Sequence, residues 1–283
     1  MKILIGVLHS KEPQLQDCIK SIENQLYSYH YNYFILSGLN KSEAHDTLYS
    51  KFMVESDNYD LFVKLDADMI IERQDFFQFL YSIFHNDTEL DWMRLLIHDH
   101  FLDQNISGLN IYRSSVKWTK NCNNYFTDRV MIKSSVRKDL GVDPTTIWIT
   151  HCKSGSMYQA FNFGFHRGIK SSLLGVPNKI ILPKLQWIAF SRILTLIKTE
   201  QTRERLMILA SWIYTFENNV TDSAINENNS LKDEAFSYLD SLTDQNLYNY
   251  ILDSIAFKYL KIGLIGMIFY TLHCKIKSLQ VEC

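Results

Sequence analysis

The strongest constraint on the fold is an alternation of short apolar runs and amphipathic stretches in the first 65 residues. Runs of strand length cover Ile3–Leu8, Tyr33–Leu36 and Leu61–Leu65, whereas Leu15–Ile22 and Ala44–Val54 carry apolar residues at helical spacing. Strands that alternate with helices at such short intervals pair in parallel, with helices on both faces of the sheet. The pattern predicts an α/β fold with a mostly parallel sheet flanked by helices.

The remainder of the chain changes character after residue 170. Further apolar runs of strand length lie at residues 93–97, 109–112 and 147–150. Long stretches with helical spacing then occupy residues 187–216, 231–242 and 247–277. Glycine and proline interrupt the chain between Gly175 and Pro183. We therefore predict two domains, a catalytic one at 1–175 and a helical C-terminal region at 176–283.

Composition excludes several classes of protein. The 283 residues are 46% hydrophobic and include only 10 glycines and 4 prolines, which argues against a disordered or linker-rich chain. The net charge of −2 provides no field that attracts a polyanion, so nucleic acid is not an expected partner. The five cysteines are scattered without a C-x-x-C pair, which is typical of reduced thiols. These features predict a cytoplasmic protein.

The segment Lys64–Ile70 carries the clearest chemical signal. Asp66 and Asp68 flank Ala67 directly after the third predicted strand, so both carboxylates can face one divalent cation. Mg²⁺ or Mn²⁺ held by few protein ligands keeps positions open for phosphate oxygens, as a diphosphate requires. His9, Ser10 and Gly38 follow neighbouring strands, at the edge of the sheet where such folds bind ligands. The alternative is a turn with two solvated carboxylates.

Three segments together resemble nucleotide-sugar glycosyltransferases of the Rossmann-like GT-A fold, and are most similar to glycosyltransferase family 2. They are Ile3–Ser10, Asn40–His45 and Lys64–Ile70, and the resemblance extends over residues 1–115 and more loosely to 170. It implies a metal ion that bridges the donor's phosphates, with Asp68 as a direct ligand and Asp66 at the ribose or the metal shell. It also implies donor contacts, with UDP as the expected nucleotide, from Leu8, His9, Ser10, Glu12 and Lys41.

A catalytic base is the next requirement of this chemistry. Direct displacement by a hydroxyl needs a carboxylate within hydrogen-bond reach of that hydroxyl. The family's usual Glu-Asp pair before a helix is not cleanly present, and its nearest counterpart is Thr127-Asp128-Arg129. We take Asp128 as the candidate base, which implies inversion at the anomeric carbon. The alternative for Asp128 is a helix N-cap or a surface ion pair with Arg129.

Residues after the last predicted strand supply further candidates. His151 follows the apolar run at 147–150, and the resemblance implies a late histidine that completes the metal shell, where imidazole suits Mn²⁺. A structural histidine is the alternative. Arg167 and Lys170 can stabilise the leaving diphosphate, while Gly164 and Gly168 let the segment close over the donor. A solvated helix face is the alternative for these two cations.

His98-Asp99-His100 has the spacing of a rival metal site. In a strand, however, the two histidines share one face and Asp99 points to the other. A zinc site there would need a further ligand that the sequence does not announce. We interpret the tripeptide as lining the binding site of the acceptor, with Asp99 binding a hydroxyl of that acceptor.

The stretch 262–272 is apolar on all sides and is flanked by basic residues. Eleven residues are too few for a helix to cross a bilayer, which takes about 20. A buried helix is the default interpretation. Contact with the inner face of the membrane, and a homodimer seam, both stay open.

These features favour a metal-dependent glycosyltransferase that moves a sugar from a nucleoside diphosphate-sugar to a hydroxyl. The expected acceptor is a glycan or glycolipid in surface polysaccharide or lipopolysaccharide synthesis.

A phosphohydrolase of the haloacid dehalogenase type also uses D-x-D, but its motif opens the domain and precedes a later acidic pair that we do not find. A nucleotidyltransferase would need a glycine-rich loop after the first strand. A non-catalytic sugar-nucleotide-binding scaffold stays open, because the Glu-Asp pair is missing.

Overall fold

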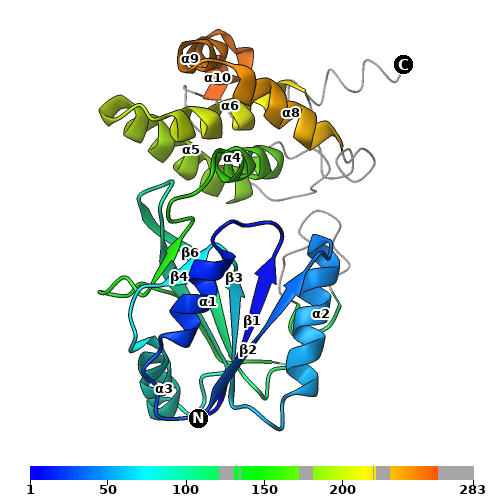
Figure 1. Ribbon diagram of the computed structural model, residues 1–283, viewed down its shortest axis with the longest axis vertical. Helices are drawn as coiled ribbons and strands as arrows, with labels where there is room; N and C mark the ends of the chain where they lie inside the picture. The colour runs from blue at the N-terminus through cyan, green and yellow to red at the C-terminus, as the bar shows by residue number, and fades with distance from the viewer. Residues whose placement is uncertain (121–130, 134, 172–180, 219, 221–229, 261–283) are drawn as a thin grey trace. The chain divides into compact units, whose positions relative to one another are not determined.

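The computed structural model describes residues 1–120, 131–133, 135–171, 181–218, 220 and 230–260 (Figure 1). The chain divides into two compact units, Met1–Gly155 and Ser156–Cys283. This division lies earlier in the chain than the boundary expected near residue 175. The difference arises because helix α4 (Met157–Ser171) packs closely against α6 (Arg203–Glu217) and so belongs to the second unit.

The first unit contains an eight-stranded sheet and three helices among its described residues. Its strands are β1 (Ile3–His9), β2 (Tyr31–Ser37), β3 (Leu61–Asp66), β4 (Met69–Ile71), β5 (Trp92–Asp99), β6 (Gln104–Arg113), β7 (Lys138–Val142) and β8 (Ile149–His151). Its helices are α1 (Leu15–Glu23), α2 (Lys41–Val54) and α3 (Phe76–Asn86). The strands and helices predicted in the first 65 residues are all present, whereas β4, α3 and β7 were not predicted.

The sheet is mixed, with strand order β2-β1-β3-β6-β5-β8-β4 and with β7 paired to β5. Strand β1 pairs in parallel with both β2 and β3, as the alternating pattern predicted. Strand β6 is antiparallel to β3 and β5, and β4 is antiparallel to β8. Strand β5, however, is parallel to both β7 and β8. The sheet thus combines parallel and antiparallel pairs, and the prediction of a mostly parallel sheet is confirmed only in part. Residues 100–103 join β5 to β6, and a connection this short permits only an antiparallel pair.

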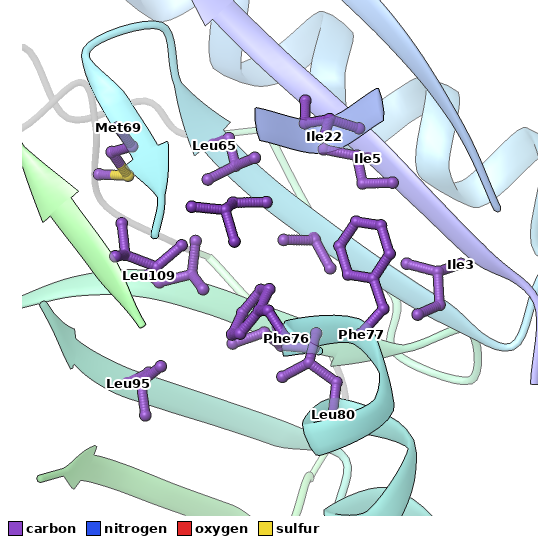
Figure 2. Close-up of a cluster of buried hydrophobic side chains, with 14 of the residues drawn as sticks. Ile3, Ile5, Ile22, Leu65, Met69, Phe76, Phe77, Leu80, Leu95 and Leu109 are labelled. Carbon is purple, nitrogen blue, oxygen red and sulfur yellow. The ribbon is translucent and has the colours of Figure 1, made fainter. Parts of the chain in front are cut away.

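Strands β1 and β3 are buried on both faces, which explains their continuous apolar sequence. On one face, Ile5 and Leu65 pack with Ile22 of α1 and with the phenylalanines of α3, as Figure 2 shows. On the other face, Leu4 and Phe62 pack with α2. Figure 1 accordingly shows α1 and α2 on opposite sides of these strands. The two cores hold β1 and β3 rigidly, so their carboxyl ends form a firm support for a site.

Arg113, at the end of β6, joins the sheet to the C-terminal end of α3. Its guanidinium donates to the carbonyl oxygens of Phe84, Asp87 and Leu90 at 2.7–2.8 Å.

We expect Arg113→Met to lower the free energy of unfolding by about 3 kcal/mol, because three carbonyls lose a charged donor. Urea denaturation measures the change. Arg73→Met is the control, because Arg73 and Asp75 form their ion pair at the surface, where solvent screens the charges and the loss of stability should be much smaller. Equal losses in the two variants would contradict the prediction.

The second unit consists of helices in its described residues. They are α4, α5 (Ile181–Thr199), α6, α8 (Ser230–Ser241), α9 (Asp244–Asp253) and α10 (Ile255–Leu260). The helical stretch predicted at 187–216 is two helices, because Thr202 caps α6 by accepting from the Arg205 N–H. No helix in the described residues is long and apolar enough to cross a membrane. The stretch 262–272 lies outside those residues.

Helices α4 and α6 approach each other through two glycines. A Cβ added at Gly164 would lie 2.0 Å from the carbonyl oxygen of Ile208. A Cβ added at Gly168 would lie 1.9 Å from the Thr215 Oγ1. The expectation that these glycines let the segment close over a donor is wrong, because both lie inside a continuous helix. A side chain at position 164 would meet the backbone of α6, and one at position 168 would first meet the side chain of Thr215.

Candidate functional site

The D-x-D segment lies at the carboxyl end of β3, beside the end of β1. Asp66 is the last residue of β3 and is the register partner of Leu8. The Ala67 N–H then donates to the Leu8 carbonyl at 2.9 Å, and the Ala67 side chain is buried. The chain turns there, and Asp68 lies directly before β4, which pairs with β8.

Asp68, His151 and Cys152 come together because β4 pairs with β8, with Met69 opposite His151. Asp68 Oδ2 lies 3.3 Å from His151 Nε2 and 3.3 Å from Cys152 Sγ. The Cys152 Sγ is 3.5 Å from His151 Nε2, so three different donor atoms form a small triangle. The Cys152 N–H donates to the Asp68 carbonyl at 2.9 Å, which ties the two loops together. Among the described residues, this is the group of three side chains arranged to hold a metal ion.

Asp99 of β5 supports His151 from behind. The His151 Nδ1–H donates to Asp99 Oδ2 at 2.8 Å, and Asp99 Oδ1 accepts from the Leu102 N–H at 2.8 Å. Asp99 has no exposed surface, so the expectation that it binds an acceptor hydroxyl is wrong. His98 does point to the opposite face, where it lies 3.7 Å from Asp103. Asp99 instead orients the imidazole and leaves its Nε2 toward Asp68, which is the arrangement of a histidine that ligates a metal.

Charge stabilises this cluster despite its burial. Burial opposes the ionised form of Asp68, but the charge of His151 outweighs it and holds the pKa of the Asp68 carboxyl below its usual value. Burial likewise opposes the charged imidazole, yet Asp68 and then Asp99 raise the pKa of His151 well above its usual range. The two side chains therefore form an ion pair at neutral pH.

Cys152 contacts His151, which in turn contacts Asp99, and a thiol, an imidazole and a carboxylate in this arrangement are typical of a nucleophilic triad. The thiol does not suit that role, because it is only 4% exposed. Burial also raises the pKa of Cys152 to about 12, so the thiol stays protonated and donates to Asp68. The geometry supports a ligand or a structural donor rather than a nucleophile.

Asp66 stands apart from this cluster. Its two carboxylate oxygens lie 2.7 and 2.8 Å from the Nζ of Lys64, whose side chain is buried in β3. The Asp66 side chain is 36% exposed. The structure therefore brings Asp68 and His151 together but not Asp66, and a contact between Asp66 and a ribose stays a prediction.

The predicted donor residues at the N-terminus lie on the loop after β1. Leu8 is buried, and the His9 Nδ1 is 3.0 Å from the hydroxyl of Ser37 at the end of β2. Glu12 accepts from the Ser10 N–H. Burial raises the pKa of the Glu12 carboxyl, and the charge of Asp68 adds to this shift.

Three other predicted residues lie on helices, and a fourth lies outside the described residues. Lys41 is the first residue of α2. Arg167 and Lys170 are on α4 of the second unit, where the Arg167 Nη1 is 3.2 Å from the Gln186 Oε1. Asp128 lies outside the described residues. The roles of all four stay predictions.

The first unit is thus a mixed α/β sheet with a carboxylate, an imidazole and a thiol gathered at the ends of β3 and β8. No protein-family model matches the chain, and no curated protein sequence matches it. Among solved structures, A197 from STIV is 18% identical with a TM-score of 0.31, covering 40% of this chain and 65% of A197. TarS of S. aureus is 11% identical with a TM-score of 0.35, covering 92% of this chain and 55% of TarS. Similarities this low carry no argument about fold or function, so any functional conclusion rests on the site.

Proposed function

We propose that this protein is a metal-dependent glycosyltransferase that uses a nucleoside diphosphate-sugar donor. The observation that carries the proposal is the pairing of Asp68 with His151 at the carboxyl end of β3, backed by the buried Asp99. In open α/β sheets, ligands bind beyond the carboxyl ends of the strands, where the connections of adjacent strands run in opposite directions. Strands β1 and β3 are such a pair. The chain leaves β1 toward β2 on one side of it, whereas β3 and the rest of the sheet lie on its other side.

The donor atoms suit a divalent cation. Asp68 offers a carboxylate whose Oδ1 is buried and has no hydrogen-bond partner among the described residues. His151 offers Nε2, 3.3 Å from the other carboxylate oxygen. Oxygen together with imidazole favours Mn²⁺ over Mg²⁺, which prefers oxygen ligands alone. When bound, such a cation would take up negative charge on the donor's diphosphate.

The remaining roles extend this proposal. Leu8, His9, Ser10, Glu12 and Lys41 would contact the nucleotide, with UDP the first candidate, and Asp66 would contact its ribose. Asp128 would accept the proton of the attacking hydroxyl on a glycan or glycolipid, with inversion at the anomeric carbon. Arg167 and Lys170 would stabilise the leaving diphosphate. We further propose a cytoplasmic location.

Thermal unfolding with UDP, GDP, CDP or dTDP, each with and without Mn²⁺, tests the donor site. A ligand at 100 times its Kd adds about 2.7 kcal/mol to stability, which raises the Tm by a few degrees. We expect a shift with one nucleotide that requires Mn²⁺. The corresponding nucleoside monophosphate is the control, because it lacks the second phosphate that the cation would bridge. No shift with any diphosphate would argue against a transferase.

Asp128→Asn separates an enzyme from a binding protein. If Asp128 is the base, turnover should fall by about 10²–10⁴-fold while the affinity for the nucleotide is retained. As a control, Asn124→Asp adds a carboxylate at a different position of the same segment. It should not restore the rate in the Asp128→Asn background. An unchanged rate in Asp128→Asn would remove this residue from the mechanism.

Asp99→Asn tests the support behind His151. Asparagine has nearly the same shape and can still accept from Leu102, but it loses the charge that orients the imidazole and raises its basicity. We expect the Kd for Mn²⁺ to rise about 10–100-fold, as measured by isothermal titration calorimetry. Asp103→Asn is the matched control, since that carboxylate is 60% exposed and faces His98 instead. Similar Mn²⁺ affinities in the two variants would show that Asp99 has only a structural role.

A further inference from the structure

The thiol of Cys152 distinguishes this cluster from a site made for hard cations. It completes a triangle of oxygen, nitrogen and sulfur whose sides are 3.3, 3.3 and 3.5 Å. Two ligands of a tetrahedral zinc ion, bound at its usual distances, lie about 3.5 Å apart. Neighbouring ligands of an octahedral Mg²⁺ lie about 3.0 Å apart. The spacing therefore matches one face of a tetrahedron.

The backbone holds the thiol in this position. Cys152 has a φ of 56°, in the left-handed region that non-glycine residues rarely adopt because it is sterically unfavourable. The hydrogen bond from the Cys152 N–H to the Asp68 carbonyl holds this conformation. The conformation directs Sγ at Asp68 and His151 rather than into the apolar core. The buried Asp68 Oδ1, which has no hydrogen-bond partner, adds an oxygen that a cation could satisfy.

We propose that Asp68, His151 and Cys152 bind a thiophilic divalent cation, with Zn²⁺ as the natural candidate and with Cys152 as a direct ligand. On binding, the Cys152 thiol and the Nε2 of the His151 imidazolium each lose a proton to solvent, and a metal–sulfur and a metal–nitrogen bond form. Three protein ligands leave a fourth tetrahedral position open for water or a phosphate oxygen. This inference deepens the proposed function, because Zn²⁺ would compete with Mn²⁺ for the position at the donor's diphosphate.

Affinity for Zn²⁺ alone cannot test the proposal, because Zn²⁺ binds more tightly than Mn²⁺ at almost any such site. The test is the dependence on sulfur. Metal-free protein is titrated with one equivalent of Co²⁺, which reports a thiolate ligand by sulfur-to-metal charge-transfer absorption. We expect this absorption in the wild type and in Cys18→Ala, which removes another buried cysteine. Cys152→Ala should abolish it.

Competition titrations then measure the affinities. The Kd for Zn²⁺ should rise at least about 10-fold in Cys152→Ala, whereas the Kd for Mn²⁺ should change less than about 3-fold. X-ray absorption of the wild type loaded with one equivalent of Zn²⁺ covers the case in which Cys152→Ala does not fold. It should find one sulfur at about 2.3 Å. A shell of nitrogen and oxygen alone, or an unchanged Zn²⁺ affinity in a folded Cys152→Ala, would overturn the proposal.

The two proposals fail separately. If sulfur does not bind the ion but a nucleoside diphosphate still raises the Tm with Mn²⁺, the donor site survives and only the zinc inference falls. If the sulfur signal is present and no nucleotide binds, the metal site survives and the glycosyltransferase proposal falls.

Discussion

Asp68→Asn is expected to abolish the Mn²⁺-dependent Tm shift by the nucleoside diphosphate and to lower turnover by about 10³-fold. Asparagine keeps the shape of the side chain but removes the charge that faces His151 at 3.3 Å. The cation loses its anionic ligand, and the imidazole loses one of its two carboxylate partners. Calorimetric titration of Mn²⁺ into the variant, followed by donor binding, measures both effects.

Asp66→Asn is the matched control for Asp68→Asn. Asp66 is a carboxylate from the same motif, but its oxygens contact Lys64 instead of the cluster. We expect Asp66→Asn to leave the Kd for Mn²⁺ within about 3-fold of the wild-type value, while the nucleotide binds more weakly. If both variants lost Mn²⁺ binding equally, Asp66 would have to be counted among the metal ligands.

Gly164→Ala is expected to lower the free energy of unfolding by about 3 kcal/mol or more. At an exposed position inside a helix, Gly→Ala raises the free energy of unfolding by about 1 kcal/mol. The sign of the change therefore tells whether position 164 is closely packed. Here the new Cβ would lie 2.0 Å from the carbonyl oxygen of Ile208, and α4 and α6 would have to separate. Urea denaturation monitored by circular dichroism measures the loss.

Gly168→Ala provides the comparison, because its nearest obstacle is a side chain. The added Cβ would meet the Thr215 Oγ1 at 1.9 Å, and the Trp212 carbonyl only at 2.8 Å. Thr215→Ala should therefore recover part of the stability lost in Gly168→Ala. Ser211→Ala should not rescue Gly164→Ala, since the backbone oxygen of Ile208 stays in place. A Gly164→Ala variant more stable than the wild type would mean that the helices pack less closely.

The first half of the sheet was predictable from local pattern. Strands β1 and β3 are buried on both faces, so their sequences are continuously apolar, and α1 and α2 between the strands show helical spacing. Parallel pairing follows because helical connections of this length are crossovers. The position of Asp68 at a strand end followed from the same argument, as did that of His151.

Other parts of the fold depended on contacts that no local pattern reports. The hairpin of β5 and β6 makes the sheet mixed, and the three-residue strand β4 is too short to show a period. Asp99 lies on the buried side of an alternating strand, a position that usually holds an apolar residue. Its partner His151 lies on β8, which pairs with β5. Because the two strands are far apart in the sequence, neither strand's sequence by itself indicates that Asp99 and His151 meet.

The sequence by itself determined the elements of the first unit and the residue types at the strand ends, because burial and hydrogen bonding act on neighbouring residues with fixed periods. Only the tertiary structure decided which of those residues meet. The β4–β8 register places Cys152 beside Asp68, across 84 positions of chain, and separates Asp68 from Asp66, only two residues away. Pairing between distant strands sets such distances, and it depends on the whole sheet rather than on any one segment.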